Sequence, residues 1–236
     1  MIPLKDDPGA PRRTFPWVML TILIVNIVVF VFELAQASEQ QLNMLFLSDG
    51  VVPVEFTRGV NIGPPPPLGI LYATLITSMF LHGGLLHIGS NMLYLFIFGD
   101  NVEDRLGHAR FLIFYFLCGI AAGITHIIAN ASSDTPSIGA SGAIAGVLAA
   151  YVRLFPHAQV RTLIFIGPLV LVPRIAAAFL ILFWFFTQFI SGITSLGAPT
   201  DTSGGVAVWA HIGGFIVGLL LVEVMRPRSR KPSLAY

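Results

Sequence analysis

Residues 138–155 read IGASGAIAGVLAAYVRLF and carry a single charge, Arg153, near their end. An apolar run of this length is typical of a helix that crosses a membrane, because a bilayer core of about 30 Å takes about 20 apolar residues. Ser141 lies near the beginning of this run, among glycines and alanines. A hydroxyl group at the start of a lipid-soluble segment needs an explanation, which other segments of the chain help to supply.

The composition of the whole chain indicates an integral membrane protein. Of its 236 residues, 55% are hydrophobic and 11% are charged, whereas a soluble domain carries about 25% charged residues. The net charge of +1 gives no sign of a nucleic-acid partner. The one cysteine, Cys118, cannot form an intramolecular disulfide, and we interpret it as a buried thiol.

Apolar segments along the chain predict six membrane-spanning helices, at residues 15–32, 68–98, 111–129, 138–155, 175–190 and 206–224. The second segment is too long for one straight helix. Gly83 and Gly84 indicate that extended or re-entrant backbone leads into a helix that begins near Leu85.

Two other apolar stretches are open to more than one interpretation. The first predicted span follows a basic start and precedes a small-residue site, like a signal peptide, but it is longer than a usual signal and we interpret it as uncleaved. Residues 162–172 are apolar but short, and prolines break them, so we predict an interfacial connector there rather than a span.

Basic residues predict the orientation of the spans, because cytoplasmic loops of membrane proteins are enriched in Lys and Arg. Such residues precede the first span, follow the last, and occupy the second–third and fourth–fifth connections: Lys5, Arg12, Arg13, Arg105, Arg110, Arg153, Arg161, Arg174, Arg226, Arg228, Arg230 and Lys231. We therefore expect a cytoplasmic tail at residues 1–14, a membrane domain at residues 15–225 and a second cytoplasmic tail at residues 226–236.

Four polar side chains are predicted at a similar depth in the outer half of the membrane. Ser141 begins the fourth span, His211 lies one to two turns into the sixth, and His87 and Asn91 share one face of the second. Polar groups at membrane depth are costly and are usually functional. Because an imidazole can take the proton of a neighbouring hydroxyl, a serine beside a histidine is the minimal activated nucleophile. No carboxylate lies at this depth, which predicts a Ser141–His211 dyad without an acidic third member.

Close packing of the fourth and sixth spans would bring this dyad together. Small residues recur at four-residue spacing in both spans and would let the two backbones approach closely: Gly142, Gly146, Ala210, Gly214 and Gly218. Acyl transfer also needs donors that stabilise an oxyanion. The start of a helix offers unpaired backbone N–H groups, so the N–H of Ser141 is one candidate donor, and the side chains of His87 and Asn91 are others.

These residues resemble the rhomboid family of intramembrane serine proteases. The resemblance rests on three motifs in the order found in that family: His82, His87 and Asn91; then Gly139-Ala140-Ser141-Gly142; then Ala210, His211, Gly214 and Gly218. It implies an all-α bundle of six transmembrane helices with both termini in the cytoplasm, Ser141 as the nucleophile and His211 as the general base. It also implies an oxyanion site formed by His87, Asn91 and the Ser141 N–H, with His82, Gly139, Gly142 and Gly214 in supporting roles.

The same resemblance implies what the protein acts on. Substrates would be single-span membrane proteins, cut within the lipid bilayer near its extracytoplasmic face, without a cofactor or a metal. The six-span plan looks like that of a bacterial plasma-membrane member. Two features depart from some members: Ala145 stands where an aromatic residue stacks on the catalytic histidine, and the first outer loop has no tryptophan. The sequence therefore does not say what orients His211.

Other polar residues and other functions have their own interpretations. We expect His82 to hydrogen-bond the loop backbone, and His126 and Gln188 to be satisfied polar groups of the core or a cavity. The Phe-rich fifth span is most simply lipid-facing, although with residues 195–205 it is also a candidate lateral gate and cap. The rival functions are a histidine-lined transporter, a metal site, and a rhomboid-like protein that binds membrane clients without cleaving them.

Overall fold

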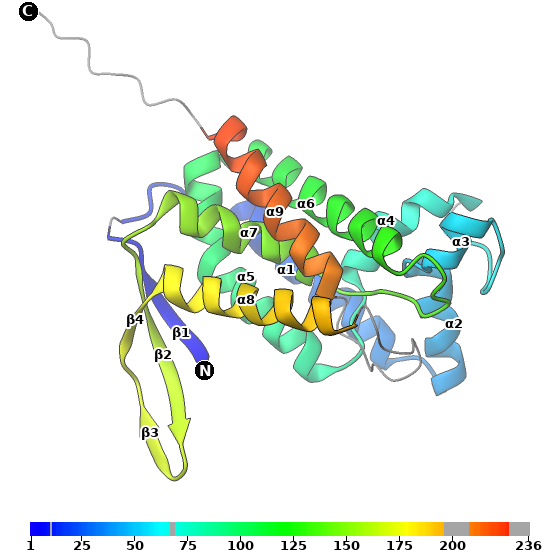
Figure 1. The fold of residues 1–236 in the computed structure, drawn as a ribbon, viewed down its shortest axis with the longest axis horizontal. Coiled ribbons are helices and arrows are strands. Elements are labelled where there is room, and N and C mark those ends of the chain that lie inside the picture. Colours follow the sequence, from blue (N-terminus) through cyan, green and yellow to red (C-terminus); the bar gives the residue numbers. More distant parts are fainter. Residues whose placement is uncertain (10, 67–68, 196–207, 227–236) are drawn as a thin grey trace, which may run out of the picture.

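The computed structural model describes residues 1–9, 11–66, 69–195 and 208–226, and within them the chain is mostly helical (Figure 1). The helices are α1 (Trp17–Leu34), α2 (Glu39–Asp49), α3 (Pro53–Arg58), α4 (Thr74–Thr77), α5 (Leu85–Leu106), α6 (His108–Ala129), α7 (Ser141–Leu154), α8 (Ala177–Ser195) and α9 (Val208–Met225). Short 3-10 turns, Leu71–Ala73 and Ser78–Phe80, flank α4. The strands are β1 (Ile2–Asp7), β2 (Gln159–Ile166), β3 (Leu169–Leu171) and β4 (Arg174–Ala176).

Helices long and apolar enough to cross a membrane number four within the described residues: α1, α6, α8 and α9. A fifth candidate is the pair Leu71–Phe80 and Leu85–Leu106, whose two parts meet at an angle of 83°. The bend lies at Gly83 and Gly84, where the sequence predicts it, and Gly84 adopts a φ of 154°. The glycine pair therefore separates the segment that enters the bundle from the helix proper.

Helix α7 accounts for the difference from the six spans that the sequence predicts. It has 14 residues, which is about 21 Å of helix and less than the bilayer core of about 30 Å. The count of six and the cytoplasmic placement of both ends accordingly stay predictions. Every residue from Gly142 to Tyr151 is buried, as expected of a helix that is apolar on all sides and surrounded by protein.

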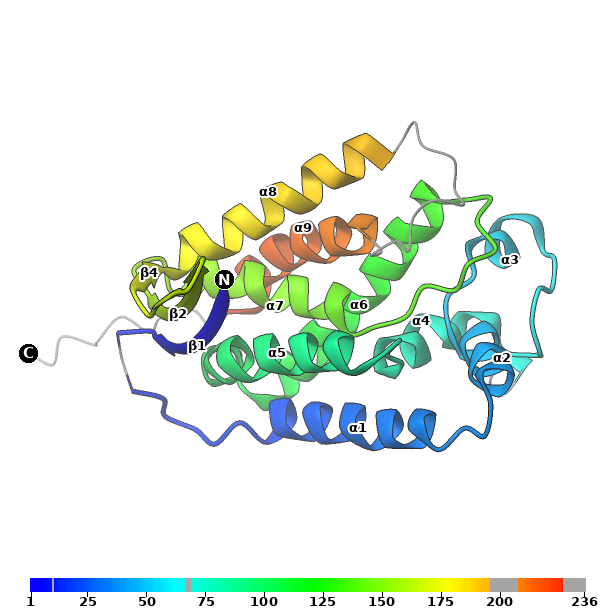
Figure 2. The ribbon, with the colours of Figure 1, turned by 90° about the horizontal axis from the view of Figure 1, so that it is seen from below.

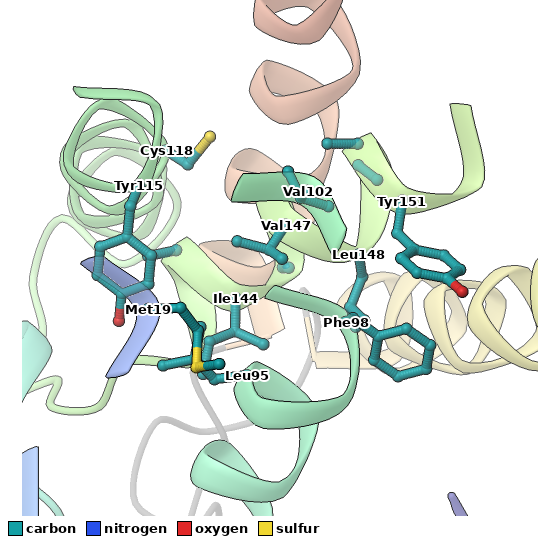
Figure 3. Packing of buried hydrophobic residues seen from close by; sticks show 14 of the residues in the cluster. Met19, Leu95, Phe98, Val102, Tyr115, Cys118, Ile144, Val147, Leu148 and Tyr151 are labelled. Atoms are coloured by element: carbon teal, nitrogen blue, oxygen red, sulfur yellow. The ribbon is translucent and has the colours of Figure 1, made fainter. Parts of the chain in front are cut away.

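The core forms around α7, which lies between α5 and α9 (Figure 2). Its apolar side chains Ile144, Val147 and Leu148 interlock with Leu95 and Phe98 of α5, and Met19 of α1 closes the cluster (Figure 3). On its opposite side α7 touches α9 backbone to backbone. A Cβ atom added to Gly214 would overlap the carbonyl oxygen of Gly142, and one added to Gly218 would overlap the backbone of Gly146. The small-residue seam predicted between these segments is therefore present.

One end of the bundle, which we call the basic end, is where α5, α7 and α9 finish and α6 and α8 begin. It carries Arg105, Arg110, Arg153, Arg174 and Arg226. An ion pair between Arg153 of α7 and Glu223 of α9 joins these helices there, and Glu223 also pairs with Arg226 just after α9. Ser141 lies at the other end of α7, which we call the serine end.

A small sheet at the basic end departs from the sequence predictions of a tail and a connector. Strand β1 pairs antiparallel with β2, which also pairs with β3 and β4. Strand β1, in the predicted tail, is thus docked on the helices: Tyr151 and Asn101 both donate hydrogen bonds to Asp6, at 2.6 and 2.9 Å. The alternation of β2, with Val160 and Thr162 buried, matches a strand that packs one face on the helices.

Candidate active site

Ser141 is the first residue of α7, and the preceding loop is fixed by backbone hydrogen bonds. Ser137 exchanges two bonds with Val51, at 2.8 and 3.0 Å, and the Gly139 N–H donates to the Ser78 carbonyl at 2.8 Å. Gly139 has a φ of +122°, a conformation that side chains strongly disfavour. The sequence Gly-Ala-Ser-Gly thus lets an extended loop turn sharply into a helix whose first N–H groups lack helical partners.

His211 lies on α9, buried to 6% exposure, with its Nε2 2.7 Å from the Oγ of Ser141. Its other ring nitrogen, Nδ1, lies 2.8 Å from Oε1 of Gln188 on α8. A carbonyl oxygen only accepts hydrogen bonds, so Nδ1 carries the hydrogen and Nε2 presents its lone pair to the serine hydroxyl. The chain Gln188–His211–Ser141 therefore holds the imidazole in the tautomer that a general base requires.

Helix α8 supplies a second contact to the histidine. The indole of Trp184 lies 5.4 Å from the imidazole, measured between ring centroids, at 47° between the planes. Trp184 and Gln188 are four residues apart and so share one face of α8. Sequence reasoning missed this role of Gln188. The available signal was a polar residue in a Phe-rich span, four positions after a tryptophan.

His87 packs against the loop that leads to Ser141. A Cβ atom added to Gly139 would lie 2.6 Å from the Nε2 of His87, so only glycine leaves room for this ring. The Gly83 N–H donates to Nδ1 of His87 at 3.3 Å, which leaves the hydrogen on Nε2. The ring thus presents an N–H donor on the side of Gly139.

Asn91 lies one turn further along α5, on the same face as His87. It is buried, and its Nδ2 has no hydrogen-bond partner within the described residues. A buried donor without a partner is unusual in a native protein. The structure records no contact between this amide and Ser141.

His82 is tied to the backbone and to α1. Its Nδ1 lies 3.2 Å from the Phe80 carbonyl, and its backbone N–H reaches both carboxylate oxygens of Glu33, at 3.0 and 3.3 Å. Glu33 lies in the last turn of α1 and is only 3% exposed. This carboxylate, which sequence reasoning did not single out, joins α1 to the bend before α5. The rings of His82 and His87 meet edge to face with centroids 5.0 Å apart.

A small cavity of about 30 Å³ lies beside the serine, lined in part by Ser78, Gly139, Ser141, Gly142 and Ala210. This volume admits one or two water molecules. Among the described residues, no group of three or more His, Cys, Asp or Glu side chains gathers in a way that could hold a metal ion. Most of the expected cap, residues 196–205, falls outside the described residues.

A family model described as a rhomboid domain matches residues 71–228, which include every one of these site residues except Glu33 and Val51. The chain belongs to the rhomboid family. Its fold class is therefore that of a helical, integral, multi-pass membrane protein. Rhomboids are generally serine proteases, and the dyad geometry lies inside the matched region.

Curated relatives of this rhomboid come from mitochondria and from a bacterium. It is 32% identical over 152 residues to "Rhomboid protein 1, mitochondrial" of Saccharomyces cerevisiae, covering 62% of this chain and 40% of the relative. It is 28% identical over 166 residues to "Presenilin-associated rhomboid-like protein, mitochondrial" of Homo sapiens, covering 66% and 39%. It is 47% identical over 83 residues to "Rhomboid protease GluP" of Bacillus subtilis, covering 34% and 16%.

The aligned part of this rhomboid spans well under half the length of these relatives. Two of the three are mitochondrial by name, which conflicts with the expectation of a bacterial plasma membrane. Membership of the family and integration in a membrane do not depend on that expectation.

Proposed function

We propose that this rhomboid is an intramembrane serine endopeptidase that cuts a membrane-spanning helix, with Ser141 as the nucleophile and His211 as the general base. The observation that carries the proposal is the hydrogen-bonded chain from Gln188 Oε1 through His211 to the Oγ of Ser141, at 2.8 and 2.7 Å. A serine that only caps a helix would need neither an imidazole hydrogen-bonded to its hydroxyl nor an acceptor that hydrogen-bonds the other side of that imidazole.

The first half of the reaction forms an acyl-enzyme. The Oγ of Ser141 attacks the scissile carbonyl carbon while Nε2 of His211 takes the hydroxyl proton, and Gln188 accepts from Nδ1–H throughout. The carbonyl oxygen becomes an oxyanion, which the Ser141 N–H, His87 Nε2–H and Asn91 amide would stabilise. His211 then gives its proton to the leaving nitrogen, so the C–N bond breaks and the amine product departs.

The second half consumes one water. The cavity beside Ser141 can supply it, His211 removes its proton, and the hydroxide oxygen attacks the ester carbon. Collapse of the second oxyanion breaks the bond to Oγ and returns the proton to the serine. Because a peptide bond inside a helix is shielded and hydrogen-bonded, the substrate helix has to unwind locally before Ser141 can reach it.

Cleavage of a single-span substrate by the purified full chain, reconstituted in vesicles, tests the proposal. Ser141→Ala and His211→Ala should each lower the rate by at least about 10³-fold. Ser132→Ala and His157→Ala, exposed residues of the same types outside the site, should cleave like the wild type. Cleavage by folded Ser141→Ala at the wild-type rate would contradict the assignment.

A fluorophosphonate probe separates an unsuitable substrate from an inactive protein. The probe reacts with an activated serine, so the wild type should be labelled and Ser141→Ala should not. A wild-type chain that neither cleaves nor reacts with the probe would be an inactive rhomboid, as the client-binding alternative requires.

A further inference from the structure

The hairpin formed by β2 and β3 has a surface that suits neither water nor the helix core. Residues 163–173 read LIFIGPLVLVP, without one polar side chain. Phe165 and Ile166 are each 60% exposed, and Val170 on the opposing strand is 55% exposed. A contiguous exposed apolar patch of this kind marks a surface that binds a partner or a membrane.

The hairpin leaves the bundle at the basic end and crosses the direction of the helices rather than continuing it (Figure 1). Helices that cross a bilayer run roughly along the membrane normal, so this direction lies along the membrane surface. The tip extends sideways past α8 at this end of the bundle (Figure 1).

Three cations line up across the base of the same sheet. Lys5 on β1 is the direct cross-strand partner of Arg161 on β2, which is in turn the partner of Arg174 on β4. Cross-strand partners project on the same face, and like charges there are destabilising. Among the described residues, none of the three forms an ion pair. All three line an open cavity of about 560 Å³.

Acidic residues offset this row only in part. Asp6 and Asp7 also line the cavity; Asp6 accepts hydrogen bonds from Tyr151 and Asn101, and Asp7 accepts from the N–H of Gly9 at 3.3 Å. The three cations outnumber these two carboxylates and form an ion pair with neither, so a positive charge faces the cavity, as expected of a site for an external anion.

We propose that this sheet and hairpin form a binding site for an anionic phospholipid at the membrane surface. The row Lys5, Arg161 and Arg174 holds the headgroup phosphate, and the apolar tip lies against the upper parts of the acyl chains. The proposal does not depend on catalysis.

The free edges of the hairpin limit its depth. In the part of the chain that the structure describes, no strand other than β3 pairs with β2 at the tip, over residues 164–166. Unpaired sheet edges do not occur in the hydrocarbon core, where no water satisfies them. The tip therefore lies at the headgroup–acyl boundary, about 5–10 Å in, as amphipathic surface elements do. Bilayer attachment is favoured over a protein partner because the exposed residues are apolar on both faces of the tip.

A fluorescent label on the tip tests the location. Cys118 is fully buried, so in Val170→Cys a maleimide dye should attach at the tip alone. The wild type, treated with the same dye, should stay unlabelled, which checks that Cys118 does not react. In vesicles containing phosphatidylglycerol, we expect quenching by a lipid spin-labelled near its headgroup and protection from aqueous iodide. Ser132→Cys, in a loop at the serine end, should show the reverse. Quenching of the tip by iodide, or crosslinking of Val170→Cys between copies, would overturn the proposal.

Removing two cations tests the headgroup site. Native mass spectrometry of the detergent-purified chain measures binding of phosphatidylglycerol against phosphatidylcholine. Each cation near an anionic surface is worth about a fivefold change in binding, so Arg161→Gln with Arg174→Gln should lose roughly 25-fold of the preference. Arg58→Gln, near the serine end, should lose none. Because the double variant relieves like-charge repulsion, its thermal stability without lipid should not fall.

Soluble competitors identify the source of the phosphate. Glycerophosphate at millimolar concentration should not displace the lipid, because it lacks the chains that the tip contacts. Equal displacement by glycerophosphate would make this a site for soluble phosphate compounds. An unchanged lipid preference in the double variant would also contradict the proposal.

Discussion

Helix α9 carries His211 and helix α8 contacts it, yet the two helices are packed in opposite ways. Helix α9 lies backbone to backbone on α7 through Gly214 and Gly218, and 44% of its span is buried. Only 22% of the α8 span is buried, and four of its five phenylalanines are exposed: Phe179, Phe183, Phe186 and Phe189. The proposed nucleophile and base thus lie on a tight seam, whereas Gln188, which contacts the proposed base, lies on a peripheral helix.

This difference separates two requirements of the proposed reaction. Proton transfer needs Ser141 and His211 held within hydrogen-bond reach, which the α7–α9 seam provides. A substrate helix needs a way in from the lipid, and α8 is the helix whose displacement would disturb the fewest buried groups. A shift of α8 would also remove Gln188 from His211. We therefore expect the orientation of the base to depend on the position of α8.

Breaking the seam should have the largest effect. In Gly214→Ala the new methyl group would overlap the Gly142 carbonyl, a contact with backbone that no side-chain rotation relieves. We expect a loss of stability of about 3 kcal/mol or more, and with it loss of cleavage. Thermal unfolding in detergent measures it. Gly89→Ala is the matched control, because a Cβ there meets nothing within 4 Å. Equal stability of the two variants would show that the seam can relax.

Removing an oxyanion donor should come next. His87→Ala or Asn91→Ala should lower kcat by roughly 10²–10³-fold, the usual loss for one donor. The KM should change little, because the donor acts mainly on the transition state. Ser90→Ala, on the same helix, tests for a general disturbance, since its hydroxyl only bonds the His87 carbonyl. If Asn91→Ala keeps the wild-type kcat, its unpartnered amide has another role.

Removing the acceptor behind the base should have a smaller effect. In Gln188→Leu the Nδ1 hydrogen has no partner and the imidazole can turn, so kcat should fall by roughly 10- to 100-fold. Gln188→Glu keeps an acceptor oxygen and should retain more activity. Thr187→Ala leaves the contact to His211 intact and should behave like the wild type. Equal losses in the Leu and Glu variants would indicate a packing role, since only the Glu variant can accept from Nδ1.

The two halves of the site differ in how far the sequence predicts them. Ser141, His211 and the bend at Gly83 follow from local patterns: an apolar run, a helix start and a glycine pair. The contact from Gln188 to His211 depends on how α8 is rotated about its axis, which composition does not encode. The β2–β3 hairpin is harder still, because its base pairs with β1 from the far end of the chain. Its apolar sequence, broken by prolines, is equally suited to a loop.

The smallest predicted effect tests whether the sheet holds the start of α8. Burial raises the pKa of Asp6 from 3.8 to about 6; the hydrogen bond from Tyr151 opposes this rise, and the nearby charges of Asp100 and Asp7 add to it. The folded protein therefore binds the Asp6 proton more tightly than the unfolded chain does. Proton binding by Asp6 therefore adds to the free energy of unfolding. This added stability is fully present below about pH 4, falls as the pH rises to about 6, and stays low above that.

Asp6→Asn removes this titration and keeps an oxygen for Tyr151. Thermal unfolding of the wild type minus that of Asp6→Asn, followed from pH 4 to 7, should therefore change by about 1 kcal/mol, less than the full shift because the carboxyl group is partly exposed. Asp7→Asn is the control. Since β4 runs directly into α8, a parallel change in cleavage rate would show that the docked strand positions α8. A stability change without any change in rate would confine Asp6 to anchoring the sheet.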